Sequence, residues 1–467
     1  MEKRLRNPIF LSDGKNEPRP QQKDYLYHLM KVWNKTKIKG AHLPPGYGKT
    51  FIARAIQRAY GKDAMVITVS NHLLDQYLKD YPEVNKIKGR AHYKNVTQYK
   101  AAFDRARDKP SIANPMSYYF GVLTGRLKVP KVLIIDEAHK LYDTMFLAGY
   151  MDFSVRQLDI PKFKDNYDLA VWARNLLANC EAKLPRVHTL KTNSQNKFFS
   201  LFEKICVLNQ MIETGSHTFV FDYKFVKTKD TLTKVLRVAP VRLELPLFKP
   251  FTDAEHIVMM SGTFSKFDLK FYDQKADYYS GEYLTRPENR KILYRPLPEQ
   301  HRKNPELIAK RVMEIFEKEN RQNMVVHVTY ELSAKLAELL PEWVITHTKA
   351  TKDIAVERFK KDGGILLAAG CAEGVDLPDD QCRVIVIPNL LYPNMGAEEV
   401  RLKMALPQGN LRYSLVTMIT TIQQLGRGAR HAKDSCVSYI LDPQFSLLYA
   451  KTYEYIPNDL NIDWTSR

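Results

Sequence analysis

The chain has 467 residues, of which 44% are hydrophobic, and this is enough for two or three domains with buried cores. No run of residues is long and apolar enough to span a membrane, and no apolar signal region follows the basic N-terminus. The five cysteines are scattered and odd in number, which argues against a disulfide framework and favours a reducing, cytoplasmic location.

The net charge of +19 is distributed unevenly along the chain. Residues 1–140 hold 27 Lys and Arg against 12 Asp and Glu, whereas residues 141–235 hold 13 against 10 and residues 236–467 hold 31 against 30. A solvated basic surface would account for this excess. We favour a polyanionic partner, because a small anionic ligand would not require so much positive charge.

The first expected helix opens at Arg19-Pro20 and runs through Trp33. Gln22 lies at its start, where a side-chain amide can contact the edge of an adenine ring. A plain helix start explains this glutamine nearly as well.

Residues 43–50 form a glycine-containing loop that follows a short apolar run and precedes a helical pattern. The loop carries Gly46 and Gly48 and ends in Gly-Lys-Thr, which is typical of a phosphate-binding loop. Lys49 is expected to reach the β- and γ-phosphates, and the Thr50 hydroxyl to hold Mg²⁺. Leu43 departs from this pattern, because a glycine or alanine is usual there, and a chance turn is the alternative.

Residues 64–70 read as a buried strand, and Asn71 reads as the cap of the helix that follows. Residues 88–93 are basic, broken by a glycine and rich in aromatics. Such segments contact phosphates and stack on bases, so we expect Lys88, Arg90 and Tyr93 to contact nucleic acid. An ordinary surface loop would look similar.

Residues 131–135 form an apolar run that predicts a buried parallel strand, and it ends in Asp136-Glu137-Ala138-His139. An acidic pair at the end of a buried strand is costly unless a cation or substrate requires it. Asp136 is expected to hold Mg²⁺ through water, and Glu137 to orient and deprotonate an attacking water. The alternative is an exposed acidic turn.

Residues 141–235 change to helical patterns, which predicts a mainly helical insertion. Strand patterns return at 233–238 and 256–260, and the second of these ends in Ser261-Gly262-Thr263. Open parallel sheets bind ligands at this end of their strands, so Ser261 and Thr263 are candidate site residues.

A second α/β series follows, which predicts a second parallel sheet. Its expected strands are residues 324–329, 343–347, 364–369, 383–388 and 437–441, and helices are expected at 331–340 and 354–361.

This second half has no Gly-Lys-Thr. It carries Glu373-Gly374-Val375-Asp376 after a strand, and Gln423 to Arg430 in a segment expected to be helical. Arg427 and Arg430 are three residues apart, so we expect them to share a helix face and to stabilise a transferring phosphoryl group. The alternative is a solvated basic helix.

Four motifs occur in a fixed order: Gly-Lys-Thr, Asp-Glu-Ala-His, Ser-Gly-Thr and Gln-x-x-Gly-Arg-x-x-Arg. In this they resemble the superfamily 2 DEAH-type helicases. The likeness is closer to the XPD/DinG branch, and it covers most of residues 19–445 but is weak over 141–235. The segments that favour this branch are 88–93, 261–264, 287–290, 373–378 and 442–445.

The resemblance implies an α/β fold with two RecA-like motor domains, ATP at their interface, and an arch-like insertion in the first. It assigns residues 1–140 and 236–285 to the first motor, 141–235 to the insertion, and 286–467 to the second motor. It implies an ATP-dependent DNA helicase that translocates on single-stranded DNA and unwinds duplex or branched DNA. The direction of translocation in this branch of the family is 5′→3′.

The resemblance also implies a role for each matching residue. Gln22 recognises adenine, and Lys49, Thr50, Asp136 and Glu137 handle phosphate, Mg²⁺ and water. Ser261 and Thr263 couple hydrolysis to movement, Gly374 and Asp376 link nucleotide to DNA, and Gln423, Arg427 and Arg430 complete the site.

Two other classes remain open. One is an ATP-driven translocase or remodeller that acts on branched DNA or RNA without extensive strand separation. The other is a catalytically idle nucleic-acid-binding module, which the intact motifs argue against. The sequence leaves the oligomeric state undetermined, with a monomer as the simplest expectation.

Many members of this branch hold an iron–sulfur cluster with four cysteines between the phosphate loop and Asp-Glu-Ala-His. No cysteine lies between Lys49 and Asp136, and Asn95 occupies the position of the first cluster cysteine. We therefore predict an enzyme without the cluster, whose wedge against the duplex is a short loop or the arch. In this branch the cluster domain helps to frame the path of the DNA strand. Its absence therefore weakens the expectation of 5′→3′ translocation that the resemblance implies.

Overall fold

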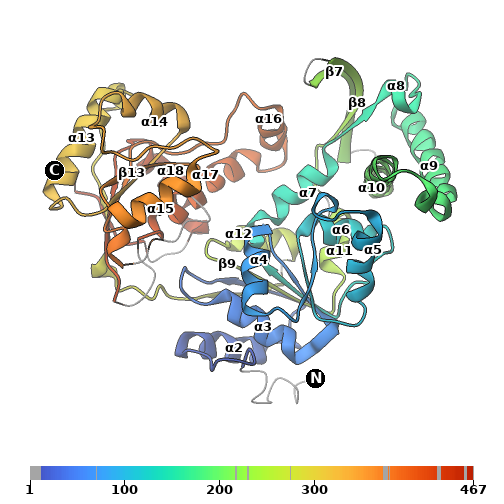
Figure 1. Ribbon diagram of the computed structural model, residues 1–467, viewed down its shortest axis with the longest axis horizontal. Coiled ribbons are helices and arrows are strands. Elements are labelled where there is room, and N and C mark those ends of the chain that lie inside the picture. The colour runs from blue at the N-terminus through green and yellow to red at the C-terminus, as the bar shows by residue number, and fades with distance from the viewer. Residues whose placement is uncertain are drawn as a thin grey trace. The chain divides into compact units, whose positions relative to one another are not determined.

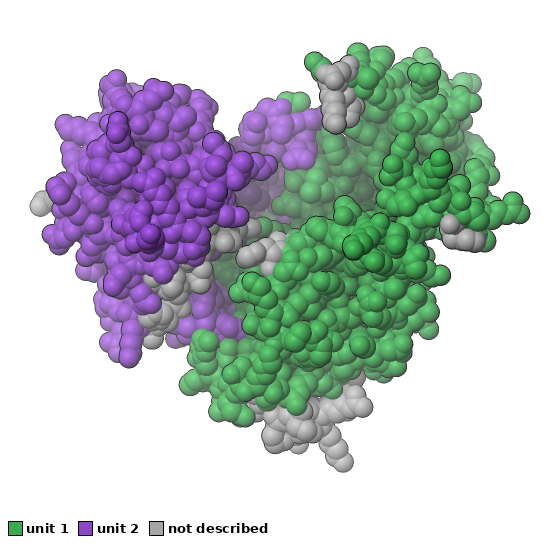
Figure 2. All heavy atoms as spheres, in the orientation of Figure 1, with its two compact units in different colours: residues 1–41, 49–279, 401–407 green, residues 42–48, 280–400, 408–467 purple. Residues whose placement is uncertain are grey.

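The computed structural model describes residues 12–69, 71–215, 218–228, 231–243, 245–273, 275–371, 377, 379–428, 433–456 and 460–465. Chain contacts divide the molecule into two compact units, coloured separately in Figure 2. Unit 1 comprises residues 1–41, 49–279 and 401–407, and unit 2 comprises residues 42–48, 280–400 and 408–467. In these described ranges no helix is long and apolar enough to cross a membrane.

Unit 1 is built on a seven-stranded sheet with the order β10-β1-β9-β5-β2-β4-β3 (Figure 1). The pairs β3–β4, β4–β2, β2–β5 and β5–β9 are parallel. The strands are β1 (Ile38–His42), β2 (Ala64–Ile67), β3 (Asn85–Ile87), β4 (Ser111–Ala113), β5 (Val132–Asp136), β9 (His256–Ser261) and β10 (Asp277–Ser280).

The centre of this sheet is apolar on both faces, as expected for parallel strands covered by helices. The four residues of β5 from Val132 to Ile135 are at most 1% exposed. On β1, a Cβ added to Gly40 would lie 2.7 Å from the ring of Phe264 and 2.9 Å from Leu269. Glycine is therefore required there for the segment after β9 to pack closely on the sheet.

Short polar caps begin several of the helices around this sheet. The Asn114 side chain accepts from Ser117 N (2.8 Å), and Pro115 occupies the first position of α6, where its missing N–H costs nothing. Asn95 caps α5 in the same way. The helices are α2 (Pro20–Val32), α3 (Lys49–Tyr60), α4 (Asn71–Asp80), α5 (Val96–Arg105), α6 (Pro115–Leu123), α11 (Lys249–Thr252) and α12 (Lys266–Tyr272).

The insertion of unit 1 combines helices with a three-stranded antiparallel sheet of order β6-β8-β7. It shares one hydrophobic cluster with the motor, because Phe146, Leu169 and Ile205 belong to the same cluster as Ile67 and Ile135. Its elements are α7 (Leu141–Gly149), β6 (Met151–Ser154), α8 (Val155–Leu158), α9 (Asn166–Lys183), α10 (Thr192–Thr214), β7 (Phe219–Thr228) and β8 (Thr231–Pro240).

Unit 2 contains a six-stranded parallel sheet of order β13-β12-β14-β15-β11-β16 (Figure 1). Its strands are β11 (Arg290–Tyr294), β12 (Met324–Val328), β13 (Ile365–Ala369), β14 (Val384–Ile387), β15 (Cys436–Ile440) and β16 (Ile462–Asp463). Its helices are α13 (Pro305–Lys318), α14 (Tyr330–Ala337), α15 (Lys352–Asp362), α16 (Glu398–Ala405), α17 (Gly409–Leu425) and α18 (Phe445–Thr452). Residues 401–407, at the end of α16, belong to unit 1.

Two local predictions were wrong. Residues 343–347 are not a strand, because Val344 N closes a turn onto Pro341 O (2.9 Å) and the segment makes a single bridge, Ile345 to Leu366. The helix expected to carry Arg427 ends earlier, since α17 stops at Leu425 and is capped by Gly426. Arg427 therefore lies in the turn after the helix, not on a helix face.

Candidate active site

The loop between β1 and α3 has the backbone of a phosphate-binding loop. Gly46 (φ +80°) and Gly48 (φ +85°) adopt left-handed conformations, which glycine reaches without strain. Lys49 and Thr50 are the first two residues of α3, whose first turn contains no acidic residue. The partial positive charge of the helix N-terminus is thus left available for an anion. The unusual Leu43 is fully buried and so serves as a core residue.

The acidic end of β5 lies beside Lys49. Lys49 Nζ is 3.8 Å from Glu137 Oε1, so residues 88 positions apart in the chain come together within unit 1. Glu137 itself adopts a left-handed conformation (φ 53°, ψ 42°) that non-glycine residues rarely occupy. Such strain, which costs about 1–3 kcal/mol, is characteristic of functional sites and fixes the direction of this side chain.

Ser261 joins this cluster from the neighbouring strand. Asp136 pairs with Met260 in the parallel register of β5 and β9, so the next residue of each strand reaches the same edge of the sheet. The Ser261 hydroxyl donates to Glu137 Oε2 (2.9 Å) and lies 2.7 Å from His139 Nδ1. Thr263 N donates to Ser261 Oγ (3.1 Å). The Asp-Glu-Ala-His and Ser-Gly-Thr motifs are thus joined by direct hydrogen bonds.

The two carboxyl groups have opposite pKa shifts. Burial, together with the charge of Glu137, raises the pKa of Asp136, and Lys49 offsets this only in part. Burial also acts to raise the pKa of Glu137, but Lys49, His139 and the Ser261 hydrogen bond outweigh it and bring that pKa below its usual value. Glu137 is therefore ionised at neutral pH and able to accept a proton.

The donor chemistry at this site fits Mg²⁺. Asp136 is a buried carboxylate with an elevated pKa, which a divalent cation would lower. Mg²⁺ bound with a nucleotide takes one or two protein oxygens besides phosphates and waters, so Asp136 and Thr50 would suffice. Among the described residues, this site included, no group of three or more His, Cys, Asp and Glu is arranged to hold a metal ion by itself.

Gln22 is buried at the start of α2, and its side chain makes one half of a capping box. Its Oε1 accepts from Arg19 N (2.8 Å), as a helix-capping glutamine would. Its contact with adenine stays a prediction.

The three residues predicted to contact nucleic acid all have partners within unit 1. Lys88 pairs with Asp75 (2.6 Å), and the Tyr93 hydroxyl bonds the backbone of residues 86 and 88. Arg90 pairs with Glu203 of α10 (2.6 Å) and thereby ties this loop to the insertion. Their contact with nucleic acid stays a prediction, with a local structural role now visible for each.

The remaining predicted residues belong to the second half of the chain. Gly374, Asp376 and Arg430 lie outside the described residues. Gln423 is half-buried on α17, and Arg427 follows that helix. Burial, and then the charge of Arg427, lowers the pKa of His327. Burial raises the pKa of Cys371, and the charges of Lys352 and Arg427 oppose that shift. Arg427 therefore lies near the carboxyl ends of β12 and β13, where parallel sheets bind ligands.

Two site features were missed by sequence reasoning. His139 was given no role, although it is the last letter of its motif and bonds Ser261. Arg126 also pairs with Glu203 (3.5 Å), and no motif contains it.

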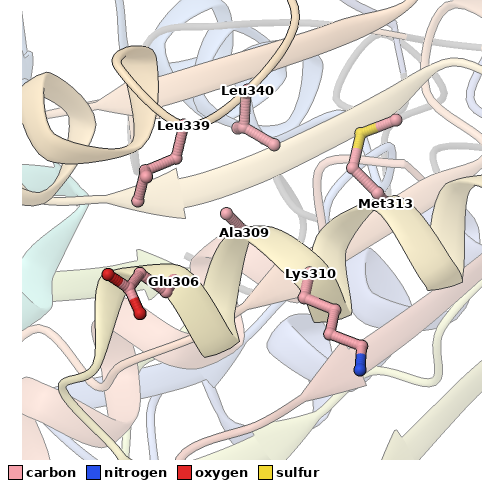
Figure 3. Close-up of a pocket in the computed structure, with 6 residues that line it drawn as sticks. All are labelled: Glu306, Ala309, Lys310, Met313, Leu339 and Leu340. Atoms are coloured by element: carbon pink, nitrogen blue, oxygen red, sulfur yellow. The ribbon is translucent and has the colours of Figure 1, made fainter.

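A hollow of about 260 Å³ lies within unit 2 (Figure 3). None of its lining residues is a predicted site residue. They are Glu306, Ala309, Lys310, Met313, Leu339 and Leu340.

Two family models match the chain in the order of its two sheets. One, described as "Type III restriction enzyme, res subunit", matches residues 15–171, and the other, "Helicase C-terminal domain", matches residues 307–460. The chain belongs to superfamily 2 of the helicases, in the XPD/DinG branch. This confirms the resemblance inferred from the motifs.

Individual relatives agree with this family. The ATP-dependent DNA helicase chl-1 of Caenorhabditis elegans is 28% identical over 117 residues, which are 22% of this chain and only 14% of that relative. A structure titled "XPD_APO" has a TM-score of 0.56 at 14% identity and covers 94% of this chain and 98% of its own. Xpd4 of S. tokodaii has the same TM-score at 16% identity and covers 95% and 100%. At such identities the structures establish the fold, and they confirm two RecA-like motor domains.

Proposed function

We propose that this protein is an ATP-dependent DNA helicase that moves on single-stranded DNA and separates duplex or branched DNA. The observation that carries the proposal is the cluster of Lys49, Glu137, His139 and Ser261 in unit 1. It supplies a cation for phosphate, an ionised base, and a hydrogen-bonded link to the next motif. Family membership supports the same activity.

The chemistry follows from these side chains. Phosphate oxygens bind the N–H groups at the start of α3, and Lys49 neutralises their charge. Asp136 and Thr50 would hold Mg²⁺, which supplies charge for the phosphoryl oxygens. Glu137 accepts a proton from the attacking water, while Ser261 and His139 hold its carboxylate in one orientation.

Coupling to movement begins at Ser261. Removal of the γ-phosphate changes the charge that faces Glu137, and the hydrogen bond to Ser261 transmits this change to β9. If unit 2 contributes Arg427 and Arg430 to the same nucleotide, hydrolysis alternately favours two arrangements of the two motors. If each motor binds DNA through its phosphates, this binding would be independent of the base sequence and would weaken at high salt.

The decisive experiment combines ATP hydrolysis with strand separation. Hydrolysis should rise at least tenfold with single-stranded DNA, and ATP should drive the separation of tailed or forked duplexes. Substrates with DNA and RNA strands of each polarity give the preference and the direction. Lys49→Ala should abolish both activities, whereas Lys62→Ala, at an exposed lysine of the same unit, should retain them.

Two other outcomes would each redirect the proposal. Stimulated hydrolysis without strand separation would identify a translocase or remodeller. No nucleic-acid stimulation in the parent protein would refute the motor function itself.

A further inference from the structure

The longest strands of the insertion form a two-stranded ribbon. β7 and β8 pair along their whole length, from Phe219 opposite Pro240 to Thr228 opposite Thr231. The third strand, β6, pairs only with residues 235–238 of β8. The outer half of the ribbon, residues 224–228 and 231–235, therefore has almost no third strand beside it (Figure 1).

One face of this ribbon is covered at its base and uncovered at its outer half. At the base, Phe221 and Tyr223 pack against Phe163, with ring centroids 6.0 and 6.5 Å apart. Alternation along the strands puts Phe225 and Leu232 on that same face. They are 66% and 68% exposed, which is unusual for two large apolar side chains on one face of a strand pair.

The charges of the outer half are of one sign. Residues 224–228 and 231–235 contain no acidic residue. The charged residues in these two ranges are Lys224, Lys227 and Lys234. Lys234 lies directly opposite Phe225, and Lys227 directly opposite Leu232. Ammonium groups beside an exposed ring and a leucine match a nucleic acid, which offers phosphates and base faces together.

The ribbon is also connected closely to the candidate active site. α7 begins two residues after His139 and leads into β6. After β8 the chain passes through α11 and then forms β9, which ends at Ser261. Both residues that hold Glu137 are thus linked along the chain to the ribbon sheet. A protein anchor or membrane contact would not require this connection.

We propose that the outer half of the β7–β8 ribbon is the wedge that meets the duplex, with Phe225 and Leu232 stacking on the terminal base pair and Lys227 and Lys234 contacting the flanking phosphates. The inference rests on the proposed function. Stacking on an aromatic ring replaces the neighbour that a base loses when its pair opens, so the ribbon favours the opened junction.

The test uses the full-length protein with Phe225→Thr and Leu232→Thr combined, because threonine preserves strand propensity while removing the stacking surfaces. Val220→Thr is the matched control, since Val220 is 49% exposed and lies on the opposite face of β7. Both variants should melt at the temperature of the parent protein.

Three properties are measured: ATP hydrolysis with single-stranded DNA, and strand separation and base-pair opening on a forked duplex with 2-aminopurine in its terminal base pair. The double variant should retain hydrolysis stimulated by single-stranded DNA within twofold. It should separate the fork at least tenfold more slowly, and it should lose the fluorescence rise that the parent protein gives on binding without ATP. Val220→Thr should match the parent in all three.

If the double variant separated strands at the rate of the parent protein, the proposal that the ribbon is the wedge would be overturned. The wedge proposal would also be overturned if the parent protein gave no fluorescence rise on binding the fork. It would be overturned as well if the only property that the double variant lost were binding to anionic lipid vesicles. If the parent protein shows no nucleic-acid-stimulated hydrolysis, the motor function fails, and the fluorescence signal still decides whether the ribbon opens a base pair.

Discussion

Ser261 is the residue whose replacement probes the active site most sharply. Its hydroxyl can donate one hydrogen bond and accept two. The geometry uses all three, with donation to Glu137, and acceptance from Thr263 N and from the Nδ1–H of His139. Ser261→Ala removes all of them inside a buried site, because Ser261 is fully buried.

The expected magnitude follows from these bonds. A hydrogen bond to a charged group is worth about 1.5–3 kcal/mol, and a buried group left without a partner costs a similar amount. We expect Ser261→Ala to lower the stability of unit 1 by about 2–3 kcal/mol. If the bond to Glu137 contributes fully in the transition state, turnover falls about 10- to 100-fold.

The assay compares steady-state ATP hydrolysis and thermal unfolding with those of Ser265→Ala. Ser265 is also buried, donates to Asp268 Oδ2 (2.8 Å) and accepts from Asp268 N (3.1 Å), so both of these side-chain hydrogen bonds are to a residue outside the site. Ser265→Ala should lose about 1 kcal/mol of stability and keep turnover within twofold. Parent-like turnover in Ser261→Ala, or an equal loss in Ser265→Ala, would refute the reasoning.

Three further predictions concern other parts of the chain. Arg427→Ala should lower turnover about 10³-fold with ATP affinity unchanged within threefold, and parent-like turnover would remove Arg427 from the site. Glu203→Gln should lower the melting temperature of unit 1, because Arg90 and Arg126 lose their shared anion at a cost of about 3 kcal/mol; an unchanged melting temperature would show that the cluster is not stabilising. Anaerobically purified protein should be colourless and contain no stoichiometric iron or acid-labile sulfide, and about four irons per chain would contradict this.

The strands of both sheets that carry motifs could be predicted from the sequence. β5 and β9 are continuous apolar runs that end in polar residues, and this pattern alone predicts buried parallel strands with a site at one edge. The register that brings Ser261 to Glu137 could not be predicted, because it depends on which strands are neighbours.

The insertion was harder to predict because its strands mix apolar and charged residues. β7 alternates Phe, Asp, Tyr and Lys from residue 221 to 224, and only part of β8 gave a strand signal. The structure adds β6 and β7 to what was expected to be mainly helical. Such strands are stabilised by their cross-strand partners, which local patterns do not reveal.

Local signals also misled where tertiary contacts decide the outcome. Arg427 and Arg430 have helical spacing, but α17 stops at Leu425 and Gly426 caps it before Arg427. A Cβ on the following Gly428 would lie 2.4 Å from Cys436 Sγ, so the chain there runs too close to β15 for a continued helix with side chains. The ion pair of Arg90 with Glu203 could not be predicted either, because a sequence does not show that these two residues, far apart in the chain, lie side by side; contact of Arg90 with nucleic acid stays a prediction.

The assignment of Glu137 as the catalytic base is the central claim, and one measurement tests it directly. Steady-state ATP hydrolysis by Glu137→Gln is compared with that of the parent protein at saturating single-stranded DNA, with ATP affinity measured in parallel. Glutamine keeps the shape and can still accept from Ser261, but it cannot take a proton, so turnover should fall about 10²- to 10⁴-fold while ATP still binds. Turnover at the parent rate in Glu137→Gln would contradict the account.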